Sequence, residues 1–205
     1  MEAKLITLEV GDTRLETANP NLVRQVLEQT CGLGGQFVEA FLDVMTPHSV
    51  PPLGAVWPGE GGVNAGLVRG DGGTRDYYLI VPTGDDAEFE DLAYGGRGAE
   101  IEGAGSAWDG LANTRALLAS GLDCPAANAA AGFTRDGHND YYLPARRELQ
   151  VAEANVSEVF SKVWHWSSTQ YSADYAYTMG FSVGSQSIHD KGGEARVRPV
   201  RRKFL

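Results

Sequence analysis

The sequence lacks the features that mark several large classes of protein. No apolar run reaches the roughly 20 residues that span a bilayer, and the opening MEAKLITLEVGD lacks the basic-then-apolar pattern of a secretion signal. The net charge is −10, whereas nucleic-acid binding needs a basic surface. We therefore expect no membrane insertion, no nucleic-acid partner and folding in a cytoplasm.

Cysteine is scarce. The chain has two, Cys31 and Cys124, and neither lies in a C-x-x-C motif. Their spacing does not favour a bond between them, although pairing is possible. Because disulfides are rare in the cytosol, we expect two free thiols.

Motifs for metal, phosphate and nucleophile chemistry are also missing. The sequence has no G-x-x-x-x-G-K-[ST] loop and no G-x-S-x-G turn. An acidic stretch lacks the regular spacing of a calcium loop and is interpreted as solvated: Asp85, Asp86, Glu88, Glu90 and Asp91. The four histidines show no i,i+4 pair: His48, His138, His165 and His189. We expect no enzymatic activity, no metal and no cofactor.

Apolar patterning predicts a small N-terminal module over residues 1–50. Alternation in the first 18 residues predicts a β-hairpin. Asn19-Pro20 then marks the start of a helix, and helical spacing continues through Phe37 and Met45 in a second one. These faces carry more apolar surface than a unit of this size buries alone. We expect residues 1–50 to self-associate or to dock on other proteins.

Residues 51–205 predict a mixed α+β domain. Glycine is abundant, with 26 residues in the chain, which indicates many tight turns. Short strands are expected from Pro51 to Pro82, an acidic glycine-rich loop over 84–106, helices over 109–120 and 144–156, and strands to the end of the chain. Within the last strands, Arg196 and Arg198 lie on one face, and we interpret the basic tail as pairing with carboxylates such as Glu148.

The segment WHWSSTQY at 164–171 predicts a strand and, after it, a binding surface. Trp164 and Trp166 lie two apart and therefore share a face, so at least one indole is expected in the core. The following residues are rich in Tyr, Ser and Gly, which suit adaptable binding loops. Tyr177 fits the core as well as it fits a contact. The candidate ligand-binding residues are Tyr171, Asp174, Tyr175, Ser185, Gln186, His189 and Asp190.

Several motifs of residues 108–202 occur in the order seen in one protein family. They are WDG with a following NT, then GFTRDGHNDYYLPARREL, WHWSSTQYSADYAY and VRPVR. With these motifs the segment resembles the Lcl C-terminal domain family of bacterial surface and phage tail proteins. The resemblance implies a C-type lectin-like fold that binds ligands on the loops and strands of its C-terminal half. The usual calcium and sugar motifs, Glu-Pro-Asn or Gln-Pro-Asp with a later Trp-Asn-Asp, are absent.

The resemblance implies a phage tail-associated virion protein that binds a host receptor, either a glycan or a protein. Its expected partners are other virion proteins and further copies of the chain, bound through residues 1–50. Two alternatives are a purely structural virion or decoration protein without a ligand, and a bacterial surface adhesin. The missing secretion signal counts against the adhesin.

Overall fold

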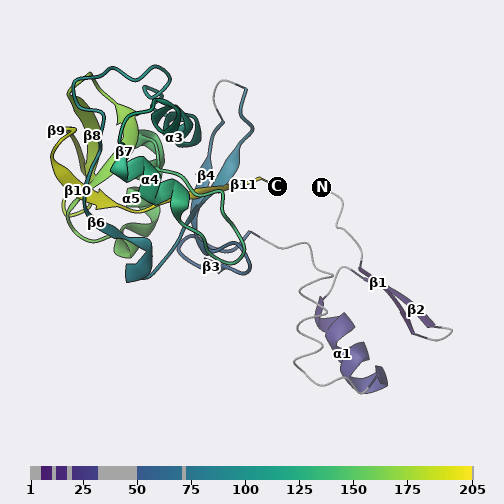
Figure 1. Cartoon of the computed structure of the whole chain (residues 1–205). Coiled ribbons are helices and arrows are strands. Elements are labelled where there is room, and N and C mark those ends of the chain that lie inside the picture. Colours follow the sequence, from purple (N-terminus) through teal and green to yellow (C-terminus); the bar gives the residue numbers. More distant parts are fainter. Residues whose placement is uncertain (1–5, 11–12, 18–19, 32–49, 71–72, 205) are drawn as a thin grey trace. The chain divides into compact units, whose positions relative to one another are not determined.

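The computed structural model describes residues 6–10, 13–17, 20–31, 50–70 and 73–204 (Figure 1). The chain divides into two compact units, Met1–Val50 and Pro51–Leu205. Among the helices of the described ranges, none is long and apolar enough to cross a membrane.

The first unit contains the predicted hairpin and the first predicted helix. β1 (Ile6–Val10) pairs antiparallel with β2 (Thr13–Thr17). α1 (Pro20–Cys31) begins at its proline. Proline suits the first turn because a backbone N–H there would have no hydrogen-bond partner within the helix. Val23 and Leu27, one turn apart, are both buried. The second predicted helix and the state of the Cys31 thiol lie outside what the structure describes.

The second unit contains two sheets that are almost wholly antiparallel. One has the strand order β11-β5-β4-β3, and the other has the order β6-β10-β7-β8-β9, in which β10 runs parallel to β7. The last strand of the chain, β11, therefore lies in the same sheet as β3, β4 and β5, the first strands of this unit. The strands are β3 (Val56–Trp57), β4 (Gly62–Val68), β5 (Tyr77–Val81), β6 (Phe89–Ala93), β7 (Trp164–Gln170), β8 (Tyr175–Gly180), β9 (Ser185–Asp190), β10 (Glu194–Val197) and β11 (Arg201–Lys203).

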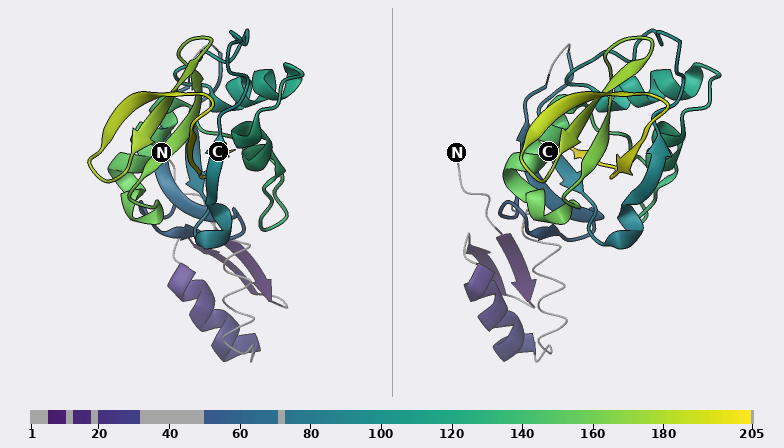
Figure 2. Two further views of the ribbon diagram at one scale, coloured as in Figure 1. Left: turned by 60° about the vertical axis from the view of Figure 1, so that its left-hand side comes forward. Right: turned by 90° about the vertical axis from the view of Figure 1, so that its left-hand side faces the viewer.

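Helices pack between and beside these sheets, which confirms the α+β class. The two predicted helices are observed as α3 (Gly110–Ala119) and α5 (Arg146–Val156). Asp109 caps α3 by accepting a hydrogen bond from Ala112 N at 2.9 Å. α5 contacts β4 and β8, and Figure 2 shows the β8–β9 hairpin at one side of the unit. Two single turns of 3-10 helix are also present, Asp85–Ala87 and Ser157–Val159.

Two apolar clusters fill the interior of the unit. Leu149 and Val156 of α5 join Leu79 of β5 in the first. In the second, Trp166 packs against Tyr94 with ring centroids 5.5 Å apart, and its indole N–H donates to Leu92 O at 2.7 Å. Trp166 is 1% exposed. One of the two paired indoles is thus a core residue, as the strand pattern predicted, while Trp164 is half-buried.

Two parts of the sequence prediction need correction. Residues 84–106 are not one loop, because β6 pairs antiparallel with β10 and packs Phe89 and Leu92 against the core. An additional helix, α4 (Pro125–Gly132), was not predicted. Its segment is mostly alanine and therefore lacks the helical spacing of apolar and polar residues from which a helix is predicted. Pro125 at its start was the one helix signal. Cys124, just before α4, is a buried free thiol, and burial raises its pKa.

Candidate functional site

The β8–β9 hairpin presents one face that carries exposed aromatic side chains. In its register Tyr175 lies opposite Asp190, Tyr177 opposite Ile188, and Met179 opposite Gln186. Directly opposed residues share a face of the sheet. Tyr171, just after β7, lies edge-on to Tyr177 with ring centroids 5.5 Å apart. Tyr171 is 56% exposed and Tyr175 43% exposed, so this face offers ring surface to a ligand.

Arg146, the first residue of α5, completes this surface. Its guanidinium lies over the Tyr177 ring, 4.4 Å from the centroid. We call Arg146, Tyr171, Tyr175, Tyr177 and Ile188 the arginine–tyrosine face. Large amphipathic rings beside a guanidinium favour recognition by stacking, by hydrogen bonding and by charge.

The backbone of Arg146 is fixed, whereas its side chain lacks a counterion. Arg146 N donates to Thr169 Oγ1 at 3.0 Å, and the Gln186 side chain donates to Arg146 O at 2.7 Å. Within the described part of the chain the Arg146 guanidinium forms no ion pair, and its buried Nε has no hydrogen-bond partner. A cation in the first turn also opposes the helix dipole. Helix stability therefore does not explain this arginine.

A similar arrangement lies next to Arg146 in the sequence. The Arg147 guanidinium lies over the Trp108 ring at 5.0 Å from the centroid, and the backbone N–H of Arg147 donates to Ala107 O at 3.0 Å. The Arg147 side chain donates to the Gln150 side chain at 3.2 Å. Trp108 is 41% exposed. The N-terminal turn of α5 thus presents two guanidinium groups, each stacked on a surface aromatic ring.

The structure divides the predicted ligand-binding residues among several positions. Tyr171 and Tyr175 lie on the arginine–tyrosine face. Gln186 and Asp190 share that side of the hairpin but have internal partners: Gln186 holds Arg146, and Asp190 pairs with Arg97 at 2.9 Å. The bond from Gly192 N, with that from Arg97, lowers the pKa of Asp190.

The other predicted residues lie elsewhere. His189 is on the opposite side of the hairpin, where its ring contacts Trp164 at 4.9 Å between centroids. The register places Ser185 on that same side, opposite Gly180. Asp174 is exposed in the turn before β8, and its backbone carbonyl accepts a hydrogen bond from Lys191 N at 2.8 Å. The seven predicted residues therefore do not form one continuous surface.

Sequence reasoning missed Arg146, Arg147 and Trp108 as members of the site. One signal was present: the run ARREL places two arginines in the first turn of a helix, where a carboxylate is the favourable charge. The aromatic partner of Arg146 is Tyr177, which lies on a strand 31 residues further along the chain, so the pairing depends on the tertiary fold.

The basic tail pairs internally, as its strand pattern predicted. Glu148 accepts from Arg202 at 3.3 Å, and Glu88 accepts from Arg198 at 3.0 Å. Further ion pairs join Arg196 to Glu90 and join Arg201 to both Glu60 and Asp140. These cations stabilise the fold and are not available for an acidic partner.

Glu148 is at the centre of the most deeply buried of these clusters. Its Oε1 accepts hydrogen bonds from the hydroxyls of Tyr77 at 2.5 Å and Tyr142 at 2.6 Å, and its Oε2 accepts from Ala145 N at 2.7 Å. Burial raises the pKa of Glu148, and the charge of Arg202 together with these hydrogen bonds opposes that rise. Every oxygen of the buried carboxylate is satisfied, as burial of a charge requires.

The acidic stretch at 85–91 is solvated as predicted at four exposed residues, Asp85, Asp86, Glu90 and Asp91, but not at Glu88. Glu88 is inside the unit, bonded to the His165 ring, to Ser161 Oγ at 2.8 Å and to Arg198. Burial raises the pKa of Glu88, but its bonds to His165 and Ser161 and the charge of Arg198 outweigh burial and lower it to about 2. Of the described residues, no three His, Cys, Asp or Glu side chains are grouped so that they could hold a metal ion.

No protein-family model matches the chain, and no curated protein matches it.

Proposed function

We propose that this protein is a receptor-binding component of a phage virion, in which the arginine–tyrosine face engages an acidic saccharide of the host surface. One observation carries the proposal. The Arg146 guanidinium lies over the Tyr177 ring without an acidic partner in the described ranges, and exposed Tyr171 and Tyr175 lie on the same face as Tyr177. The charge of Arg146 opposes the dipole of its own helix, so helix stability does not explain why an arginine occupies this position.

The proposal takes Pro51–Leu205 as a C-type lectin-like domain. The motifs of residues 108–202 support it, as does the return of β11 to the sheet of β4 and β5. Short antiparallel strands with long connections leave loops on one side of such a unit for binding. Fold by itself does not define function, so the ligand is inferred from the chemistry of the arginine–tyrosine face.

The chemistry of this face favours a saccharide with carboxylate or phosphate groups. Sugar rings stack on Tyr171 and Tyr175, and an acidic substituent pairs with Arg146 through a charge-assisted hydrogen bond. None of these contacts requires a metal ion.

Binding of the full chain to an acidic and a neutral polysaccharide tests the proposal. Immobilised polygalacturonate and dextran serve as probes, with and without EDTA. We expect polygalacturonate to bind, EDTA to have no effect, and the variant Tyr171→Ala/Tyr175→Ala/Arg146→Gln to lose about tenfold or more in affinity. The control, Leu67→Ala/Arg69→Gln, changes an exposed apolar residue and an exposed arginine on and beside β4, away from the arginine–tyrosine face.

Three results would count against this function. Equal binding of dextran would show that the ligand needs no acidic group and therefore no pairing with Arg146. Loss of binding in EDTA would show that binding requires a metal ion. Absence of binding both to polygalacturonate and to cell-envelope fractions of host bacteria favours the purely structural virion protein.

We further propose that residues 1–50 provide the assembly contacts in the virion. The support is the apolar patterning of this unit, including Leu22 of α1, which is 39% exposed beside buried Val23 and Leu27. Since Pro51–Leu205 is a compact unit, deletion of residues 1–50 should leave a monomer in sedimentation. An oligomeric 51–205 fragment would assign assembly to the second unit.

A further inference from the structure

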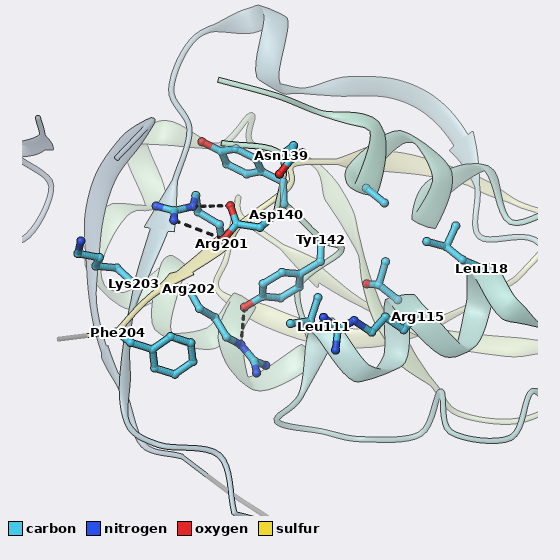
Figure 3. Close-up of a pocket in the computed structure, with 13 residues that line it drawn as sticks. Leu111, Arg115, Leu118, Asn139, Asp140, Tyr142, Arg201, Arg202, Lys203 and Phe204 are labelled. Carbon is cyan, nitrogen blue, oxygen red and sulfur yellow. Dashed lines mark hydrogen bonds and ion pairs between the residues drawn. The ribbon is translucent and has the colours of Figure 1, made fainter. Parts of the chain in front are cut away.

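A separate cavity of about 610 Å³ lies between α3, the segment 139–142 and the end of β11. Figure 3 shows Leu111 and Leu118 along α3, Phe204 across from them, and Tyr142 with Arg202 between the two sides. The volume falls within the range of roughly 300–1,000 Å³ that small-molecule sites occupy. The cavity shares no lining residue with the arginine–tyrosine face.

Apolar side chains form much of the cavity wall. Leu118 is 42% exposed and Phe204 39% exposed at its rim, while the Tyr142 ring is buried. Leu111 is partly buried against the core below. Exposed large apolar groups gathered around a hollow indicate a contact surface for an apolar ligand.

The charged residues of the cavity differ in whether they are already neutralised. Arg201 is bonded to Asp140 at 2.8 Å, Arg202 to Asp109 at 2.7 Å, and Lys203 to Glu60 at 2.6 Å. Arg115, exposed in the middle of α3, forms no ion pair with any described residue, and α3 itself carries no carboxylate. The cavity therefore combines an apolar wall with one cation that lacks a counterion in the described structure.

We propose that this cavity binds a small amphiphilic carboxylate. Its aliphatic or aromatic body lies against Leu111, Leu118, Tyr142 and Phe204, and its carboxylate pairs with Arg115. The neutralised cations around Tyr142 keep that side of the cavity rigid without competing for the ligand. The proposal does not depend on receptor binding at the arginine–tyrosine face.

Calorimetric titration of the full chain with decanoate and with decanol tests this site. We expect saturable decanoate binding with a Kd of about 1 mM or tighter and weaker binding of decanol. Arg115→Gln should weaken decanoate about fivefold and leave decanol unchanged. Leu118→Gln should weaken both ligands. Both replaced side chains are exposed, so circular dichroism should be unaltered.

Arg69→Gln is the matched control, since it removes an exposed arginine outside both the cavity and the arginine–tyrosine face, and it should leave both titrations unchanged. Absence of saturable binding overturns the proposal. Equal affinity for decanoate and decanol with no effect of Arg115→Gln also overturns it, because the ligand then needs no anionic group. An effect of Arg115→Gln without one of Leu118→Gln places the ligand outside this cavity.

Discussion

The arginines near the end of the chain and those at the start of α5 have opposite environments. Arg198, Arg201 and Arg202 have side chains no more than 7% exposed, and each lies within 3.3 Å of a carboxylate oxygen. Arg146 and Arg147 lie over exposed or half-buried rings and have no acidic partner in the described part of the chain. Because a buried charge requires a partner, the first group stabilises the fold, and the second is the group to which we assign the proposed ligand.

The largest effect expected from breaking the buried group is that of Glu148→Ala. This change leaves Arg202 without one carboxylate, and it leaves the hydroxyls of Tyr77 and Tyr142 without their acceptor. Loss of one member of a buried ion pair costs about 3–5 kcal/mol, which urea unfolding should show as a lower free energy of unfolding. Glu158→Ala, at an exposed position, is the control and should stay within about 0.5 kcal/mol of wild type. Equal stability of the two variants would remove Glu148 from its structural role.

The two tryptophans of β7 should differ in how much each contributes to the stability of the core. Trp166→Ala removes a buried indole and its bond to Leu92 O, so we expect a loss of about 3–5 kcal/mol. Trp164→Ala removes a half-buried ring that contacts the His189 ring and fills the space where a side chain at Gly180 would begin, and the resulting loss of stability should be at most half as large. The comparison is made by thermal unfolding. A Trp164 variant as unstable as the Trp166 variant would place both indoles in the core.

Acid should weaken the buried ion pair between Glu88 and Arg198. Glu88 has a pKa of about 2 in the fold against an ordinary value of 4.5, so the folded state binds fewer protons than the unfolded chain between these values. Its contribution is therefore complete above about pH 4.5 and is lost as the pH falls towards 2. Glu148 acts with the opposite sign, because burial raises its pKa.

Unfolding measured across this pH range tests the role of Glu88. We expect a loss on the order of 2 kcal/mol from pH 5 to pH 2 for this group. Glu88→Gln should be less stable at pH 7 and should show a flatter decline in acid, whereas Glu158→Gln should decline as the wild type does. An unchanged slope for Glu88→Gln would assign the acid sensitivity to other carboxylates.

The sequence was informative where structure is local. The start of α1 followed from Pro20, and the helix beginning near Pro144 followed from its apolar spacing. β6 was missed because Glu90 and Asp91 gave it the composition of a solvated loop, yet Glu90 and the preceding Glu88 pair with Arg196 and Arg198, about 110 residues later in the chain. The candidate site was half predicted for the same reason: Tyr171 and Tyr175 were apparent from composition, but the place of Arg146 over Tyr177 required the fold.

The smallest effect on stability is expected at the arginines left for a ligand. Arg146→Gln and Arg147→Gln remove the stacking of each guanidinium on its ring, a contribution of about 0.5–1 kcal/mol at exposed sites. They also remove a cation from the first turn of α5, which relieves an unfavourable interaction with the helix dipole. These terms oppose each other, so the free energy of unfolding should change by no more than about 0.5 kcal/mol in urea titrations of either variant. Arg202→Gln, by contrast, leaves buried Glu148 without its cation and should cost several times more. A comparable loss in Arg146→Gln would mean that this arginine stabilises the fold, and the basis for a ligand on the arginine–tyrosine face would disappear.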